Sequence, residues 1–384
     1  MYGTISNPNY VATVIRVERL EDLEGLDNLK ALRLFGMQAL VSKNTEIGTV
    51  GILFSTEVQL SEEFARVNNL HRHTDRNADP TVGNGYLDDN RRVKAIKLRG
   101  HRSDSIFLPL SSLSYLGISI PARVQIGDVF DSIEGHEICK KYLVRQPSEN
   151  RGPVARVRRV DVKNFPMHVD TENWWRNADK IPADREVIVT QKLHGTSVRV
   201  GKVLVERDLK WYEKLARKVG IRVQDRDYKL VVGSRKVVKS IDGEAESAGK
   251  DHFYANDEWT SLAVRKNLDA IPEGFLVYGE IVGYTSDNAP IQKNYTYDAA
   301  LSHGEKNELF VYRVATITSQ GHMIDLSWEQ VKRFCKDFGL KWVPELMIIQ
   351  HADFAPAVDW YMDRRYYDEF IEGSYSVDNF FNEA

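Results

Sequence analysis

Short apolar runs separated by turn-forming residues dominate the first 150 residues of the chain. Groups such as DPTVGNG at 79–85 separate runs rich in Val, Ile, Leu and Phe, a pattern typical of short strands joined by turns. Five or so short strands favour a small barrel over a parallel sheet. We therefore expect a β-rich first domain, residues 1–150. Its clearest strand candidates are residues 11–17, 31–41, 48–54, 93–98 and 105–110.

Strand-like and helix-like patterns alternate irregularly after the stretch RQPSENRGPVARVRR (145–159), which has the composition of a linker. Residues 208–220 and 327–339 have the pattern of helices, and in the second helix Ser327 fits an N-cap and Gly339 a stop. This mixture predicts an α+β second domain, residues 151–384, with an antiparallel sheet rather than a βαβ series. Its predicted strands are REVIVTQK, SVRVGKVLV, YKLVVGSRKV, GFLVYGEIVG and ELFVYRVATI.

Composition narrows the class of protein. The chain has 384 residues, of which 42% are hydrophobic and 28% charged, enough for two or three domain cores. Cys139 and Cys335 lie far apart, which argues against a disulfide framework and a zinc knuckle. The start MYGTISNPNY lacks a basic-then-apolar order, and no run of about 18 apolar residues occurs. We expect a protein of the cytoplasm or another intracellular compartment.

One segment of the first domain, RRVKAIKLRGHR at 91–102, carries basic residues and no acidic one. Such charge can guard the exposed edge of a sheet. Unopposed basic charge also attracts the phosphates of nucleic acid, whatever the net charge of the whole chain, here −3. Both interpretations stay open. The second one gives a nucleic-acid-binding set, namely Arg91, Arg92, Lys94, Lys97, Arg99 and Arg102.

The segment QKLHGTS at 191–197 lies between two predicted strands. A lysine at the end of a strand is usually a solvated charge, but here Gly195 would let a ligand approach the backbone closely. Lys192 could act as a nucleophile only in its neutral form, which requires a pocket that favours that form. Further on, Glu280 lies in the apolar run VYGEIVG, where a carboxylate is costly to bury alone. Glu280 therefore either pairs with a basic residue or receives a polar ligand such as a ribose.

KLHGTS at 192–197 resembles motif I of the covalent nucleotidyltransferases, the superfamily of polynucleotide ligases and mRNA capping enzymes. Its Lys-x-His-Gly form is similar to the RNA ligase branch, and GSRK, VYGEIVG and VYRV resemble motifs Ia, III and IIIa in the family's order. The resemblance covers nearly the whole chain and is closest to the Deinococcus-type RNA ligases. Further agreement comes from FPMHVDT (165–171), PIQKNYTYD (290–298), LSWEQVK (326–332) and VPEL (343–346).

This resemblance implies an OB-like β-barrel that binds RNA over 1–150, followed by a nucleotidyltransferase domain over 151–384 with ATP-grasp-like antiparallel sheets and helices. It implies an ATP-dependent RNA ligase that seals 5′-phosphate and 3′-hydroxyl RNA ends in RNA repair. The expected cofactors are ATP and a divalent metal, Mg²⁺ or Mn²⁺, whose ligands the sequence does not single out. The basic segment 91–102 would then contact RNA.

The resemblance also assigns roles to single residues. Lys192 would receive AMP from ATP, and His194 beside it would assist later steps. Glu280 would contact the ribose, Tyr312 would stack on adenine, and Arg235 would hold phosphate. Gln191 departs from the glutamate often found there, although an amide can still face the edge of adenine. The nucleotide-binding set is Gln191, Gly195, Ser197, Arg235, Glu280 and Tyr312.

The end of the sequence departs from the family pattern. Motifs IV and V, the second with paired lysines, should follow the VPEL region, but the sequence continues to FIEGSYSVDNFFNEA. Glu372-Gly373 precedes no apolar strand, and no lysine follows Lys341. We therefore expect a ligase polypeptide without motifs IV and V, which a second polypeptide could supply. The alternative is a non-catalytic or split RNA-binding protein with a degenerate nucleotidyltransferase fold.

Overall fold

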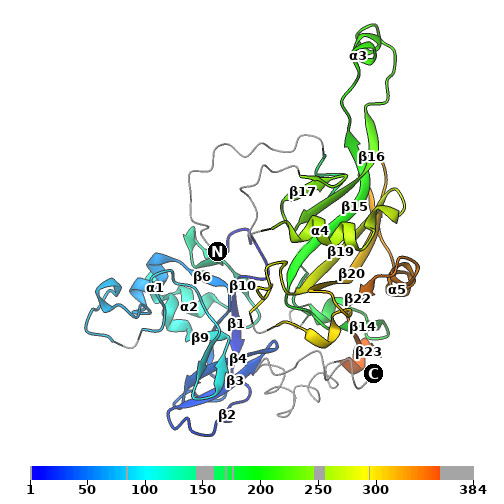
Figure 1. Cartoon of the computed structure of the whole chain (residues 1–384). Coiled ribbons are helices and arrows are strands. Elements are labelled where there is room, and N and C mark those ends of the chain that lie inside the picture. Colours follow the sequence, from blue (N-terminus) through cyan, green and yellow to red (C-terminus); the bar gives the residue numbers. More distant parts are fainter. Residues whose placement is uncertain are drawn as a thin grey trace. The chain divides into compact units, whose positions relative to one another are not determined.

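The computed structural model describes residues 2–83, 85–143, 160–168, 171–174, 177–245, 256–293 and 295–354. The chain divides into two compact units, each with its own hydrophobic core (Figure 1). The first unit comprises Met1–Asn150 and Thr171–Lys180, and the second comprises Arg151–Asp170 and Ile181–Ala384. The predicted linker at 145–159 lies outside the described residues.

Short antiparallel strands build the first unit. Its largest sheet has the order β10-β1-β5-β9, and a second sheet has the order β2-β3-β4. Helix α1 (Glu62–Val67) is capped by Ser61, whose side chain accepts a hydrogen bond from the backbone N–H of Phe64 (3.1 Å). The remaining elements are β1 (Ala12–Arg16), β2 (Glu21–Asp22), β3 (Leu29–Leu34), β4 (Met37–Ser42), β5 (Val50–Ser55), β6 (Val58–Leu60), β7 (Ile96–Leu98), β8 (His101–Ser103), β9 (Ser105–Pro109), α2 (Ile120–Arg123), β10 (Val129–Phe130), β11 (Ser132–Ile133), β12 (His136–Glu137), β13 (Cys139–Lys141) and the 3₁₀ turns Thr74–Arg76, Leu110–Leu116 and Ala178–Lys180.

The predicted β-rich character of this unit is confirmed, but a closed barrel is not found. Residues 31–41, predicted as one strand, form the β3–β4 hairpin, which turns at Phe35 and Gly36 with φ of 55° and 69°. The pairs β6–β13, β7–β8 and β11–β12 are separate two-stranded ladders. Within the described part of the chain no sheet closes on itself, because these short strands do not continue the main ladder.

An antiparallel sheet forms the centre of the second unit, as the sequence pattern predicts. Its strand order is β18-β17-β16-β15-β19-β20-β21, while β22 pairs with β20 in parallel and β14 pairs separately with β23. The strands are β14 (Glu186–Thr190), β15 (Thr196–Glu206), β16 (Arg226–Ser234), β17 (Val238–Ile241), β18 (Glu244–Ala245), β19 (Phe275–Gly283), β20 (Asn307–Ile317), β21 (Met323–Asp325), β22 (Lys341–Trp342) and β23 (Glu345–Gln350).

The two faces of this sheet have different coverings. Alternation along β15 sends Val198 and Val200 toward α4 (Glu258–Arg265) and α5 (Trp328–Asp337), where one core forms. Val203 and Tyr278 belong to a second core on the other face. Helix α5 begins at the predicted cap Ser327, whose side chain accepts from the backbone N–H of Gln330. Short 3₁₀ turns lie at Leu268–Ala270 and Asp298–Ala300.

Helix α3 (Trp211–Lys218) lies between β15 and β16, at the far end of their hairpin from the rest of the sheet (Figure 1). It agrees with the helix predicted over 208–220. No helix in the described ranges is both long and apolar enough to cross a bilayer.

Candidate active site

The loop that carries Lys192 joins β14 to β15 in the second unit. Lys192 and His194 are exposed, whereas Gln191 and Leu193 are buried. The backbone N–H of Gln191 donates to the carbonyl oxygen of Pro344 (2.9 Å). Alternate side chains of the loop therefore anchor it in the protein, and Lys192 is left accessible.

Gly195 and Glu280 meet where β15 begins. The N–H of Gly195 donates to Oε1 of Glu280 (3.1 Å), and a Cβ on Gly195 would lie 2.1 Å from the carbonyl oxygen of Ile281. Burial raises the pKa of Glu280 to about 7, while the charges of Lys192 and Arg235 and the Gly195 N–H act to lower it. Glu280 is thus a half-buried carboxyl group in the electrostatic reach of both predicted cationic residues.

Ser197 and Tyr312 extend this cluster across three strands. Ser197 pairs with Glu280 in the β15–β19 ladder, so the two side chains share one face of the sheet. Ser197 Oγ lies 3.4 Å from the hydroxyl of Tyr312 on β20. The ring of Tyr312 contacts His168 edge-on, with centroids 5.0 Å apart, and burial raises the pKa of its hydroxyl. An aromatic surface therefore lies beside the Glu280 carboxyl group.

Arg235 follows β16 directly and is exposed. Its positive charge acts to lower the pKa of Glu280, of Tyr312 and of His168. Burial has the larger effect at each group, because it raises the pKa of Glu280 and Tyr312 and lowers that of His168. Arg235 therefore contributes positive charge to the same cluster, as expected for a residue that would hold phosphate.

A buried arginine that the sequence analysis does not single out fixes the segment 160–168 to the sheet. Arg199 donates from Nη1 to the carbonyl oxygen of Phe165 (2.7 Å) and from Nε to that of Ser234 (3.0 Å). Its guanidinium group lies over the Phe165 ring, 4.4 Å from the centroid. The contacts hold His168 against Tyr312. A charged residue in the apolar run SVRVGKV was the signal that could have revealed it.

Two further tyrosines hold His194. The hydroxyl of Tyr297 accepts a hydrogen bond from the backbone N–H of His194 (2.9 Å). The imidazole ring lies against Tyr295, with centroids 4.4 Å apart and planes tilted by 33°. Both tyrosines come from the segment PIQKNYTYD, about a hundred residues away in sequence. They restrain the loop on the side that follows Lys192.

A buried side-chain acceptor directly precedes Lys192 in the loop. The side-chain oxygen of Gln191 is buried and has no hydrogen-bond partner among the described residues. An unsatisfied buried acceptor is costly, and the amino group of adenine is a suitable donor.

The described part of the chain gathers no group of three or more His, Cys, Asp or Glu side chains that could hold a metal ion. Magnesium at nucleotide sites is commonly held by phosphates, waters and one or two carboxylates, so such a group is not required.

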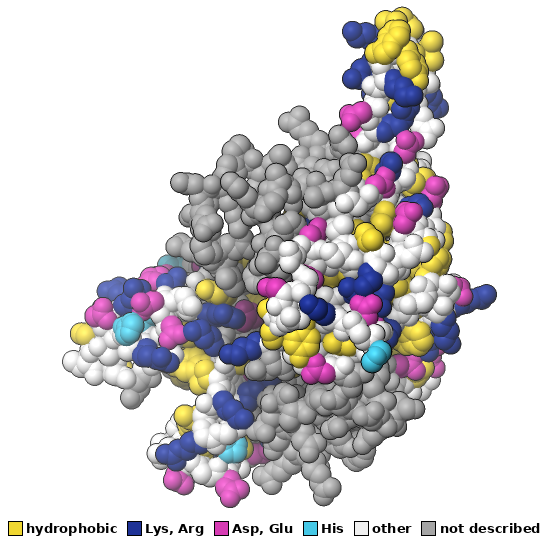
Figure 2. Space-filling view, in the orientation of Figure 1, with side chains coloured by type: hydrophobic (Ala, Val, Ile, Leu, Met, Phe, Trp, Pro, Cys, Tyr) yellow, Lys and Arg dark blue, Asp and Glu magenta, His cyan; other side chains and the backbone are white. Residues whose placement is uncertain are grey.

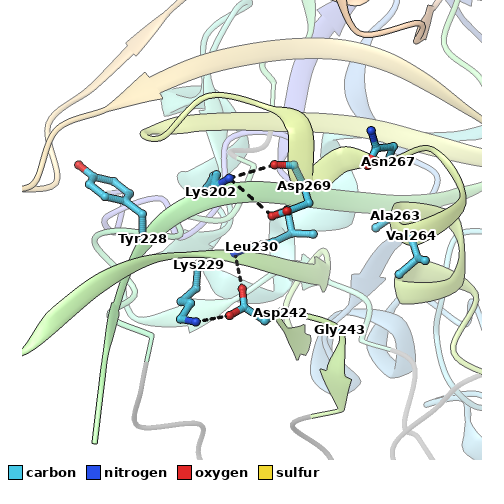
Figure 3. Close-up of a pocket in the computed structure, with 10 residues that line it drawn as sticks. All are labelled: Lys202, Tyr228, Lys229, Leu230, Asp242, Gly243, Ala263, Val264, Asn267 and Asp269. Carbon is cyan, nitrogen blue, oxygen red and sulfur yellow. Dashed lines mark hydrogen bonds and ion pairs between the residues drawn. The ribbon is translucent and has the colours of Figure 1, made fainter. Parts of the chain in front are cut away.

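A cavity of about 480 Å³ on the α4 side of the sheet is a separate feature (Figure 3). Lys202 donates to the carbonyl oxygen of Asp269 (3.0 Å), and Lys229 forms an ion pair with Asp242. The charged side chains at this cavity are thus engaged with one another. None of the predicted catalytic or nucleotide-binding residues lines it, and we assign it no chemistry.

The basic segment 91–102 lies in the first unit, and the assumption that its charge is unopposed is wrong. The acidic partners lie outside the segment, where a local pattern could not reveal them. Lys97 and Arg99 are exposed on the β7–β8 hairpin, and Arg99 Nη1 donates to the carbonyl oxygen of Gly25 (2.9 Å). The RNA-binding role of the segment stays a prediction. Ion pairs join Arg91 to Glu62, Arg92 to Glu57, Lys94 to Asp88 and Arg102 to Asp104.

The predicted catalytic and nucleotide-binding residues all lie in the second unit. Glu372-Gly373 lies outside the described residues, so the absence of motifs IV and V stays a prediction.

Comparisons with known proteins agree with this geometry. Naegleria gruberi RNA ligase with PPi has a TM-score of 0.51 at 16% identity, over 88% of this chain and 84% of that chain. A mutant of that ligase with AMP and Mn has a TM-score of 0.52 at 17% identity, over 90% and 87%. At such low identity this likeness shows the fold alone. No curated protein matches the chain. The RNA ligase family model matches residues 185–373, and this segment, which contains the candidate site, is therefore similar to the RNA ligase family.

Proposed function

We propose that the chain is an ATP-dependent RNA ligase that seals 5′-phosphate and 3′-hydroxyl ends through an AMP adduct on Lys192. The hydrogen bond from Gly195 to Glu280 carries the proposal. It holds a half-buried carboxyl group beside an exposed lysine, at the place where the RNA ligase family model matches. A ribose hydroxyl would donate to this carboxylate, and the α-phosphate would then lie near Lys192.

The first step would be attack of the neutral Lys192 amine on the α-phosphorus of ATP. A P–N bond forms, and the P–O bond to pyrophosphate breaks. The AMP then passes to the 5′-phosphate of RNA, and the 3′-hydroxyl displaces it to form the phosphodiester. A divalent metal would supply charge neutralisation at the phosphates. N. gruberi RNA ligase has been solved with ATP and Mn, which supports this choice of cofactors.

The other residues of the cluster would bind and orient the nucleotide. Tyr312 offers a ring on which adenine can stack, and the orphan oxygen of Gln191 would accept from the adenine amino group. Arg235 would hold a phosphate with its forked donors. Ser197 keeps Tyr312 in place through the contact between their hydroxyl groups. His194, held by Tyr295 and Tyr297, would assist after adenylylation.

We also retain the RNA-binding role of the first unit and the similarity to Deinococcus-type ligases as proposals. Because Arg91, Arg92, Lys94 and Arg102 have acidic partners, phosphate contact there would compete with these ion pairs.

The test is a two-stage transfer assay with the full chain, Mn²⁺ or Mg²⁺, and ATP labelled at the α-phosphate. We expect label on the protein without RNA, then on a nicked RNA duplex with a 5′-phosphate, and finally a sealed strand. The same duplex with a 5′-hydroxyl is the control and should accept no label. RNA binding without any labelled protein would contradict the proposal and support the non-catalytic alternative.

Replacing Glu280 by glutamine should change how stability depends on pH. The pKa of about 7 in the folded protein exceeds the ordinary value of 4.5, so the folded state binds this proton more tightly than the unfolded chain. The Glu280 carboxyl group therefore lowers the free energy of unfolding as the pH rises from 4.5 to 7, by at most about 3 kcal/mol. Relative to wild type, Glu280→Gln should gain stability between pH 5 and pH 8.

Urea unfolding of both proteins at these two pH values measures the difference. Glu273→Gln, at an exposed carboxylate just before β19, is the matched control. A stability difference between wild type and Glu280→Gln that is the same at pH 5 and pH 8 would show that the carboxyl group is not desolvated.

A further inference from the structure

The β15–β16 hairpin forms an arm, residues 198–234, that leads away from the candidate active site. Its strands pair at nine positions, from Val198 with Ser234 to Glu206 with Arg226. At roughly 3.3 Å per residue, this ladder spans about 26 Å. The base of the arm adjoins Ser197 and Arg235, and its tip, residues 207–225, carries α3 (Figure 1). The tip is therefore held at a set distance from Lys192.

The tip helix is fixed to the arm although none of its residues is buried. Glu213 accepts from both Nη atoms of Arg207 (3.0 and 2.5 Å) and from the backbone N–H of Lys210 (2.7 Å). Arg207 is the first cause that lowers the pKa of Glu213 to about 2. At the other end the N–H of Ile221 donates to the carbonyl oxygen of Ala216 (3.0 Å). These contacts preorganise an exposed helix.

One side of this helix presents an apolar stripe to solvent. Trp211, Leu215 and Val219 follow one another at intervals of four, so they lie on one face. Their exposed fractions are 77%, 56% and 69%, and Tyr212 beside them is 50% exposed. The Trp211 and Tyr212 rings meet edge-on with centroids 5.9 Å apart. An exposed apolar patch with two aromatic rings on a fixed helix is typical of a binding surface.

Basic side chains border the stripe. Lys214 and Lys218 lie one turn apart on the flank of the helix, and Arg222 follows it. These three residues form no ion pair with any part of the chain that the structure describes, unlike Arg207 and Arg217, which pair with Glu213 and Asp225. Figure 2 shows apolar and basic side chains together at the tip of the arm. The tip thus combines ring faces with unopposed positive charge.

We propose that the tip of the arm binds an unpaired RNA strand at a distance from the ends being joined. Bases would stack on Trp211 and Tyr212, while Lys214, Lys218 and Arg222 would contact phosphates. Base stacking on aromatic rings beside a basic groove is the usual recognition of single strands, since the bases of a duplex are already stacked. This inference rests on the proposed function for the identity of the polymer.

The position of the arm favours RNA over a lipid surface as the occupant. The strands that carry the tip begin at Thr196 and end at Ser234, next to Arg235, so a ligand at the tip is held at a fixed distance from the candidate active site. A polymer that must reach Lys192 gains from such a second contact, whereas a membrane would not. At about 3.4 Å per stacked nucleotide, the tip lies roughly eight nucleotides from the base of the arm.

The test measures binding of a fluorescent single-stranded RNA of twenty nucleotides and of one of five nucleotides, at several salt concentrations. Trp211→Ala with Tyr212→Ala should weaken binding of the long RNA at least about tenfold, because both rings on which bases stack are removed. Lys214→Gln with Lys218→Gln should reduce the slope of log affinity against log salt by about 1.4. The short RNA cannot contact the tip and the candidate active site together, so it should bind the wild-type chain more weakly than the long RNA does.

Arg333→Gln with Lys336→Gln, at two exposed basic residues on α5, is the matched control and should leave the affinity for the long RNA near that of wild type. AMP transfer to Lys192 needs no RNA and should persist in all variants. If the tip variants lose long-RNA binding but even the wild-type chain never accepts AMP, the result would support the arm as an RNA site and refute the proposed function. Unchanged long-RNA binding in both tip variants would overturn the inference. So would tip-dependent binding to phosphatidylserine vesicles without an effect on RNA.

Discussion

Lys192→Ala should abolish the transfer of AMP from ATP to the chain. The reaction needs an amine nucleophile, and the exposed Lys192 lies close enough to Glu280 for its charge to lower the pKa of that carboxyl group. Removing the amine leaves no atom that can form the P–N bond. The measurement is acid-labile label on the protein, mapped to a peptide by mass spectrometry. Lys202→Ala, on β15 and at the separate cavity, is the control and should remain labelled.

Lys192→Arg is the more specific test of nucleophilic chemistry, because arginine keeps a positive charge on a side chain of similar length. A guanidinium group stays protonated at any working pH and cannot attack phosphorus. We expect ATP binding to survive in this variant while labelling is lost, which separates nucleophilic chemistry from electrostatic attraction. Label that persists in Lys192→Ala at the wild-type level would refute the assignment of Lys192.

The strands and helices of the second unit follow from local pattern. Runs of apolar residues predict β15, β19 and β20, because cores cover both faces of these strands. Ser327 predicts the start of α5, because its hydroxyl satisfies a free N–H of the first turn. The candidate site residues were predicted from the order of the motifs, in which the loop of Lys192 precedes the strand that carries Glu280. The structure brings these two segments together through the Gly195 hydrogen bond.

Features that depend on long-range pairing were beyond the local pattern. The partners of Arg91 and Arg92 are Glu62 and Glu57, which a window of twelve residues does not contain. The contact between His194 and Tyr297 joins segments about a hundred residues apart, so no spacing rule indicates it. Helix propensity predicted α3 correctly, yet only the structure shows that its apolar side packs on nothing described. Local sequence patterns therefore predict the strands and helices, whereas the tertiary contacts determine which charged and aromatic side chains are exposed to a ligand.

Gly195→Ala should reduce labelling of Lys192 by about 100-fold or more while the chain still folds. The added Cβ would lie 2.1 Å from the carbonyl oxygen of Ile281 and 3.0 Å from Cγ of Glu280. Backbone cannot yield as a flexible side chain does, so the start of β15 must move away from β19. That movement breaks the hydrogen bond to Glu280 and displaces the adjacent Lys192. A shift of about 1 Å between reacting groups can cost roughly 100-fold in rate.

The damage should be local, because only the first pairs of the β15–β19 ladder adjoin Gly195, and the nine pairs of β15 with β16 begin beyond it. Labelling rate and thermal unfolding of the variant are measured together. Gly83→Ala is the matched control, since a Cβ there would meet no atom within 4 Å. If Gly195→Ala accepts AMP at the rate of the control, the close approach of β15 to β19 does not position Lys192. If it loses labelling and keeps its melting temperature within a few degrees, Gly195 acts by placing the nucleophile against the nucleotide.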